Sequence, residues 1–73
     1  MPQSMRVEIV SPPDRELLCA HIMLDGEQWA EVNQEHGNLE LEIYGRRDGE
    51  PWIFDFECAI GALNEAARRL QDR

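Results

Sequence analysis

The sequence of 73 residues contains no lysine and no threonine, and all seven of its basic residues are arginines. Without lysine the chain cannot form a Schiff base through a side-chain amine, and it cannot build a phosphate-binding P-loop. No apolar run approaches the roughly 18 residues that a transmembrane helix needs. The first five residues lack the basic and apolar regions of a signal peptide, so we expect a cytoplasmic protein.

Cysteine is scarce as well, and we expect Cys19 and Cys58 to be reduced thiols, on opposite sides of a sheet and not joined by a disulfide. Structural zinc sites use four ligands, usually with a C-x₂-C pair. The neighbours Cys19 and His21 do not meet that spacing, even with His36 or Cys58 added. A Gly-rich loop and a nucleophile–base arrangement are also missing. The sequence therefore predicts no metal site, no cofactor and no catalytic residue.

Acidic residues are abundant, and they are concentrated in one segment. Residues 25–57 hold ten acidic side chains and two arginines, which account for the whole formal net charge of −8. A local field of this kind attracts partners of opposite sign. It repels nucleic-acid phosphates and anionic membrane surfaces, so we expect neither as a direct partner.

The hydrophobic pattern predicts strands over residues 6–10, 16–24, 27–34 and 39–44, and residues 52–54 could add a short fifth strand. Asp25-Gly26 has the composition of a two-residue hairpin turn, because both positions suit a positive φ. Strands joined by such turns form an antiparallel meander.

The period changes to that of a helix over residues 56–71, with Asp55 as N-cap. Gly61 inside this helix costs about 1 kcal/mol relative to alanine and would permit a close approach to the sheet. The apolar positions spaced 4, 3, 4 and 3 apart, which we expect to face the sheet, are Phe56, Ile60, Leu63, Ala67 and Leu70.

The sequence thus predicts a single α+β domain over residues 1–73: an antiparallel β-meander of four to five strands with one C-terminal α-helix packed on one face. One helix covers only one face, so the other must be solvated or bound. By alternation, that face displays Arg6, Glu8, Cys19, His21, Met23, Trp29, Glu31, Glu40, Glu42 and Tyr44.

Carboxylates mixed with aromatic side chains are typical of a binding surface. Glu40 and Glu42 lie about 7 Å apart along their strand, close enough for a glycosidase pair, but so small a domain has little room for a sugar cleft. Trp29 could instead lie at the edge of the core. The candidate partner-binding residues are Glu31, Glu35, Glu40 and Glu42 for electrostatics, Trp29 and Tyr44 as anchors, and Asp48 and Glu50 in a secondary role.

The order of these motifs resembles small acidic immunity proteins of bacterial contact-dependent growth inhibition and polymorphic toxin systems. The stretches that carry the resemblance are residues 39–44, residues 48–52 and Phe54-Asp55-Phe56 leading into the amphipathic helix. The resemblance, which spans about residues 6–70, implies a cytoplasmic protein without catalytic residues. Such a protein binds one cognate toxin domain, often a basic nuclease, and blocks its active site.

The residues themselves leave a second reading open, in which the chain is a small homodimeric structural module. A second copy would then cover the open sheet face through Cys19, Met23 and Trp29. Two segments of charge −8 would repel each other in such a dimer, and added salt would weaken that repulsion.

Overall fold

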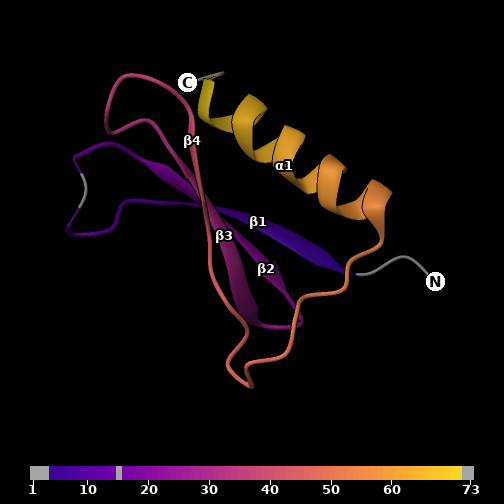
Figure 1. Ribbon diagram of the computed structural model, residues 1–73. Coiled ribbons are helices and arrows are strands. Elements are labelled where there is room, and N and C mark those ends of the chain that lie inside the picture. Colours follow the sequence, from indigo (N-terminus) through magenta and orange to yellow (C-terminus); the bar gives the residue numbers. More distant parts are fainter. Residues whose placement is uncertain (1–3, 15, 72–73) are drawn as a thin grey trace.

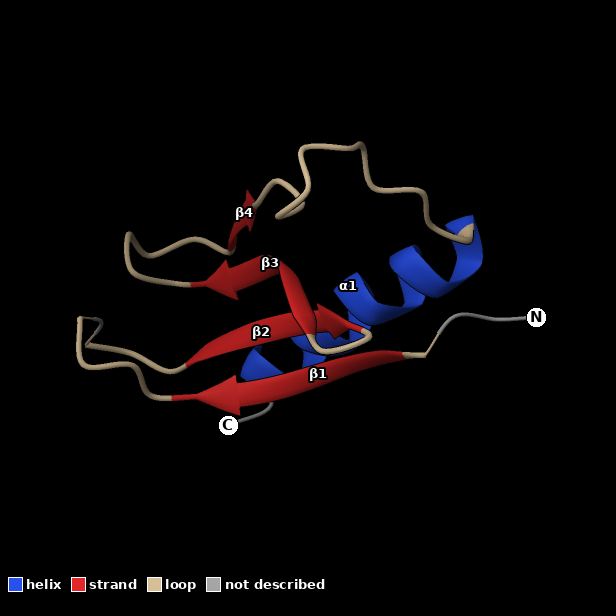
Figure 2. Ribbon diagram, turned by 90° about the horizontal axis from the view of Figure 1, so that it is seen from below, coloured by secondary structure: helices blue, strands red, loops and turns tan. Residues whose placement is uncertain are grey.

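The computed structural model describes residues 4–14 and 16–71 and shows the predicted α+β meander. The strands β1 (Met5–Val10), β2 (Cys19–Leu24), β3 (Glu27–Asn33) and β4 (Glu40–Ile43) form one antiparallel sheet in the order β1-β2-β3-β4. The helix α1 (Phe56–Gln71) packs against one face of this sheet, and we call the other face the open face. Figure 1 shows this arrangement, and in Figure 2 α1 runs behind the strands. Residues 1–3, 15 and 72–73 of the predicted domain lie outside the described residues.

The helix has the predicted bounds, but the strands differ from the prediction at their ends. β2 begins at Cys19, because the backbone N–H groups of Glu16 and Leu17 donate to the Glu35 carboxylate, at 3.2 and 3.0 Å, and not to a neighbouring strand. Residues 52–54 do not form the optional fifth strand. They contribute rings to the core edge: Trp52 stacks on Phe54 with ring centroids 5.4 Å apart.

A tight turn and a bulge set the register of the central strands. Asp25 and Gly26 take φ values of 53° and 84°, which confirms the predicted hairpin between β2 and β3. Ile22 pairs with Ala30, whereas Met23 pairs with Gln28, so Trp29 is an extra residue in β3. A bulge of this kind disrupts strict alternation. The open face therefore receives Gln28, while Trp29 turns into the core.

The placement of Trp29 on the open face was thus wrong. Its side chain is only 2% exposed and lies 4.4 Å from the Phe54 ring, centroid to centroid. Its Nε1 is buried without a hydrogen-bond partner among the described residues. Trp29 therefore belongs to the core between the sheet and the segment that leads into α1.

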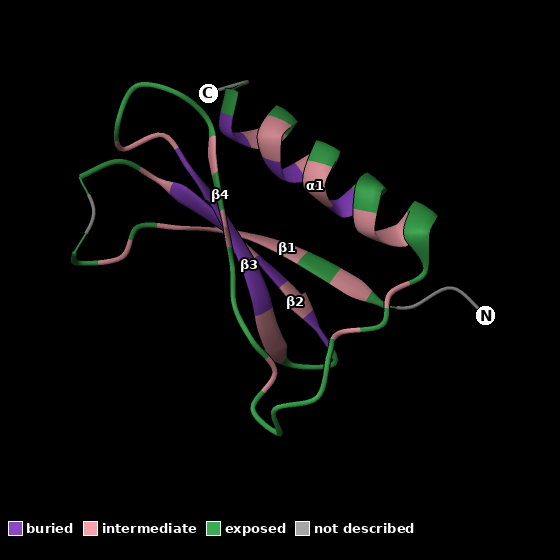
Figure 3. Ribbon diagram, in the orientation of Figure 1, coloured by how far each residue is buried: buried purple, intermediate pink, exposed green. Residues whose placement is uncertain are grey.

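The core lies between α1 and the helix-facing side chains of the sheet, as the purple segments of Figure 3 show. The stripe of α1 that faces the sheet is rotated from the predicted one. Phe56 is 75% exposed and Ile60 41% exposed, and Gly61 faces open space instead of the sheet. Leu63 and Leu70 pack against the sheet as predicted, whereas Ala62 and Ala66 lie at the contact in place of Phe56 and Ile60. The buried residues of the helix are Ala62, Ala66 and Leu70, flanked by Ala59 and Leu63.

Both ends of α1 are anchored by polar contacts. The Asp55 carboxylate accepts a hydrogen bond from the backbone N–H of Cys58 at 3.0 Å, which confirms the predicted N-cap. Near the other end, the Arg69 guanidinium donates to the carbonyl oxygen of Val7 in β1 at 2.9 Å and to Glu65 at 3.3 Å. The second anchor ties the helix to the β1 side of the sheet.

The helix leaves β4 uncovered. It contacts β1 most, then β2 and β3, and within residues 4–14 and 16–71 it makes no contact with β4. Leu41 and Ile43 point to the helix side of the sheet, yet they are 46% and 65% exposed. In this same part of the chain, no helix has the length and apolar character needed to cross a membrane.

Candidate functional site

The open face is organised around a cross-strand row of polar side chains. Glu8, His21, Glu31 and Glu42 are successive partners across β1, β2, β3 and β4. His21 Nε2 lies 3.2 Å from Glu31 Oε1, which makes an ion pair when the imidazole is protonated. The row places three carboxylates and one imidazole across the width of the sheet.

Asn33 links the middle of this row to β4. Its Nδ2 donates to Glu31 Oε2 at 3.1 Å and to Glu42 Oε2 at 3.4 Å. The Tyr44 hydroxyl donates to the other oxygen of Glu42, at 3.0 Å. Because Glu31 is only 5% exposed, these hydrogen bonds offset part of the cost of holding its carboxylate away from water.

The candidate residues predicted from the sequence divide into three groups. Glu40, Glu42 and Tyr44 lie together on β4 and directly after it, with part of each side chain accessible. Glu31 lies beside them but is buried. The remaining candidates are in other places: Trp29 in the core, Glu35 bound to the backbone of residues 16–17, and Asp48 and Glu50 in the turn over residues 46–50.

That turn is held together by its own charges. Arg46 Nη2 lies 2.8 Å from Asp48 Oδ2, and the backbone N–H of Glu50 donates to Asp48 Oδ1 at 2.9 Å. The Arg46 guanidinium also lies 5.7 Å from the centre of the Trp52 ring. Asp48 therefore shapes its own turn, and its charge is partly compensated.

Two apolar residues that the sequence did not bring forward complete the surface of β4. Leu41 and Ile43 lie on the side of β4 opposite to Glu40 and Glu42. A helix about 10 Å wide spans only two or three strands spaced about 4.8 Å apart, so a single helix on four strands leaves one strand uncovered. That arithmetic was the signal that could have identified them. We call the group Glu40, Leu41, Glu42, Ile43 and Tyr44 the β4 surface.

The nearby flank of α1 is also apolar. Arg69 reaches β1, and on a helix of 3.6 residues per turn Phe56 and Ile60 lie on the opposite flank of the buried stripe. They therefore face the side of the sheet on which β4 lies. Both are exposed.

β4 is also an edge strand, and its backbone is open to pairing. It is the last strand of the sheet and pairs only with β3 among the strands of the described residues. An edge strand presents a row of N–H and C=O groups to which an extended segment of another chain can add. The β4 surface thus combines carboxylates on one side, apolar side chains on the other and an open backbone edge.

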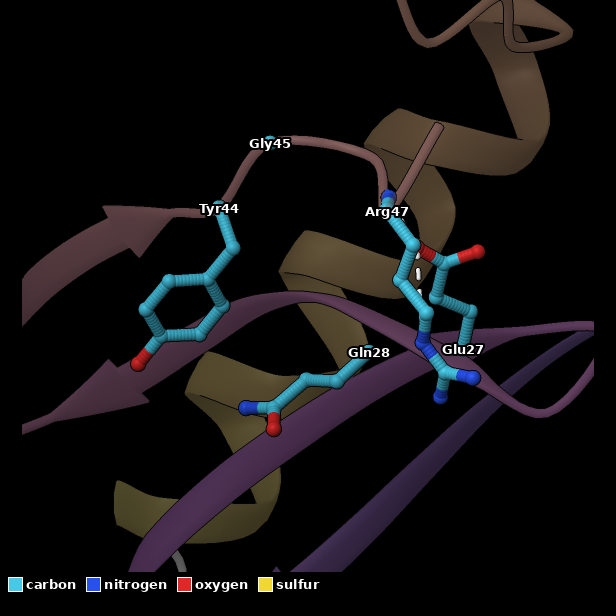
Figure 4. A pocket seen from close by; sticks show the side chains of 5 residues that line it. All are labelled: Glu27, Gln28, Tyr44, Gly45 and Arg47. Atoms are coloured by element: carbon cyan, nitrogen blue, oxygen red, sulfur yellow. Dashed lines mark hydrogen bonds and ion pairs between the residues drawn. The ribbon is translucent and has the colours of Figure 1, made fainter. Parts of the chain in front are cut away.

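A shallow hollow of about 350 Å³ adjoins the end of β4, between Tyr44 and Gly45, which follow β4, and Gln28 on β3. Figure 4 shows the Tyr44 ring and the Gln28 amide side by side, with Arg47 on the far wall. The backbone N–H of Arg47 donates to the Glu27 carboxylate at 2.8 Å. The hollow is open, and its lining includes the carboxylate of Glu27, the amide of Gln28 and the guanidinium of Arg47.

Comparisons with protein-family models, with curated proteins and with solved structures found no match for this chain.

Proposed function

We propose that this chain is a cytoplasmic immunity protein that binds a cognate bacterial toxin domain, most simply a basic nuclease, and neutralises it by stoichiometric binding without catalysis. The observation that carries the proposal is the β4 surface. An uncovered edge strand bears two carboxylates on one side and two exposed aliphatic side chains on the other. Exposed apolar groups beside charge mark interaction surfaces.

The chemistry of the surface defines the partner. An extended segment added along β4 would place every second side chain beside Glu40 and Glu42, where basic residues are favoured. Its other side chains would lie against Leu41 and Ile43, where apolar residues are favoured. The surrounding acidic field also speeds association with a basic protein, as a toxin inhibitor requires.

A second copy of the chain fits this surface less well. When two β4 strands pair as antiparallel neighbours in the register centred on Leu41, Glu40 of one copy lies opposite Glu42 of the other. Like charges directly opposite each other destabilise a strand pair. This is the physical reason for preferring a basic partner to a homodimer.

The first test identifies the partner. The chain is used to capture proteins from a lysate of its own cells at moderate salt, and each captured protein is expressed with and without the chain. We expect one basic protein that arrests growth alone and is harmless when the chain is present. Recovery of only the chain itself, at twice its mass on sizing, would contradict the proposal and favour the homodimeric module.

The second test locates the interface by calorimetric titration with the captured domain. Glu40→Arg with Glu42→Arg should weaken binding by about 100-fold or more, because it reverses two charges at the proposed contact. The matched control is Asp14→Arg with Glu16→Arg, which changes the net charge equally at two exposed positions outside the sheet. Equal losses in both variants would show a general charge effect and rule out β4 as the contact.

A further inference from the structure

The two sides of the β2–β3 hairpin bring together three side chains that bind metal ions. Cys19 and His21 are the first and third residues of β2, so both point to the open face. Glu31 is the direct cross-strand partner of His21 on β3. The Cys19 sulfur, a ring nitrogen of His21 and a carboxylate oxygen of Glu31 all lie within 4.8 Å of one another.

Two of these three side chains are more deeply buried than the other carboxylates of the open face. Cys19 is 0% exposed and Glu31 5%, whereas the His21 side chain is 25% exposed. Two ionisable groups are therefore held away from water, with the imidazole at the entrance. Asn33 and His21 already contact the Glu31 carboxylate, and a metal ion at the entrance would add a positive charge beside it.

The ligand types select a class of metal ion. Thiolate, imidazole and carboxylate are the three side-chain ligands of zinc, whereas Mg²⁺ and Ca²⁺ are bound through oxygen. A divalent ion held by one thiolate and one carboxylate has its charge neutralised. The thiol loses its proton to solvent when the metal binds. The net charge of −8 further favours a cation.

The geometry is close to that of a three-ligand site. Tetrahedral zinc with bonds of about 2.0 Å to nitrogen and oxygen and about 2.3 Å to sulfur holds its ligand atoms about 3.5 Å apart. His21 Nε2 and Glu31 Oε1 are already 3.2 Å apart, and since all three ligand atoms lie within 4.8 Å of one another, shifts of about an ångström would close the set. Asn33, 1% exposed, donates to the other oxygen of Glu31 and orients that carboxylate as an outer-shell partner does.

We propose that Cys19, His21 and Glu31 form a binding site for a zinc-class divalent ion, with a water molecule as the fourth ligand. This site is distinct from the β4 surface and does not depend on the immunity function. The sequence pattern alone brought two of the three ligands together, Cys19 and His21. The third came into view only with the register that sets Glu31 opposite His21.

The test is a titration of the full reduced chain with Co²⁺, which replaces zinc in such sites and reports its own ligands by absorption. We expect one equivalent to bind, with visible bands of four-coordinate cobalt and a near-ultraviolet thiolate-to-cobalt band. Added Zn²⁺ should abolish both. Absence of these bands, or binding without the thiolate band, would overturn the proposal.

Ligand variants assign the site. Cys19→Ser should remove the thiolate band, and His21→Gln and Glu31→Gln should each weaken Co²⁺ binding by more than about 100-fold, beyond the 10–100-fold typical of outer-shell partners. The matched controls are Cys58→Ser and His36→Gln, which remove the other thiol and the other imidazole of the chain. Loss of binding in the controls, or full binding in the ligand variants, would contradict the assignment.

Folding is checked by circular dichroism, because Cys19 is fully buried and its replacement alone could unfold the chain. His21→Gln avoids that difficulty, since its side chain is partly exposed. Zn²⁺ should also raise the thermal midpoint of the wild-type chain and should not raise that of His21→Gln. An equal rise in both would show that zinc binds elsewhere.

Discussion

Single side chains stabilise this fold at points where the backbone would otherwise lack partners, and the start of α1 is the clearest case. The Asp55 carboxylate accepts from the N–H of Cys58, one of the helix donors that has no partner within the helix. Asp55→Ala should lower the free energy of unfolding by about 1 kcal/mol, as loss of an N-cap does. Urea denaturation followed by far-ultraviolet circular dichroism measures the change.

Asparagine is the matched control at this position. Asp55→Asn keeps an oxygen that can cap the helix and loses only the favourable interaction of a negative charge with the helix dipole, typically about 0.3–1 kcal/mol. We therefore expect it to be more stable than Asp55→Ala. Equal stability of the two variants would mean that the capping hydrogen bond contributes nothing.

At the scale of elements, α1 carries a residue that weakens it without serving the packing. A methyl group at Gly61 would meet no atom within 4 Å, and the residue is exposed in the middle of the helix. Gly61→Ala should therefore raise the free energy of unfolding by about 0.5–1 kcal/mol.

The same change at Gly26, where φ is 84°, should destabilise the chain. A stabilising Gly26→Ala would contradict this reading of the turn.

The elements were also what the sequence predicted best. Strong alternation, the Asp25-Gly26 turn and the capped 3.6-residue period identified four strands and a helix with bounds Phe56–Gln71. The rotation of the helix was not predictable from periodicity alone. Large apolar residues suggested the buried stripe, whereas Ala62 and Ala66 occupy it because small side chains let the helix lie close to the sheet.

The candidate site was predicted less completely, because it depends on register. Alternation correctly placed Glu40, Glu42 and His21 on one face. It failed at Trp29, where a bulge adds one residue to β3 and turns the ring into the core. Nothing in the amino-acid pattern marks that bulge. The contact between His21 and Glu31 likewise follows only from the pairing of β2 with β3.

At the scale of the whole molecule, an uncovered edge strand leaves the chain open to self-association. Leu41 and Ile43 on an open edge favour strand addition between copies, which natural proteins suppress with charges on the edge. Glu40 and Glu42 would then act against self-association as well as toward a basic partner. Under the proposed function both roles would arise from the same charges, since an arrangement that favours a basic strand disfavours a second β4.

Neutralising these two charges tests the second role without any partner. Glu40→Gln with Glu42→Gln removes the repulsion between facing β4 strands, so sedimentation at low salt should show self-association at concentrations at which the wild-type chain stays monomeric. The control Asp14→Asn with Glu16→Gln changes the net charge equally and should stay monomeric.

In the wild-type chain, about 1 M salt should partly reproduce the self-association, because it screens charges beyond about 3 Å. A wild-type chain already dimeric at low salt would contradict this argument, since Glu40 and Glu42 would then fail to keep two copies apart.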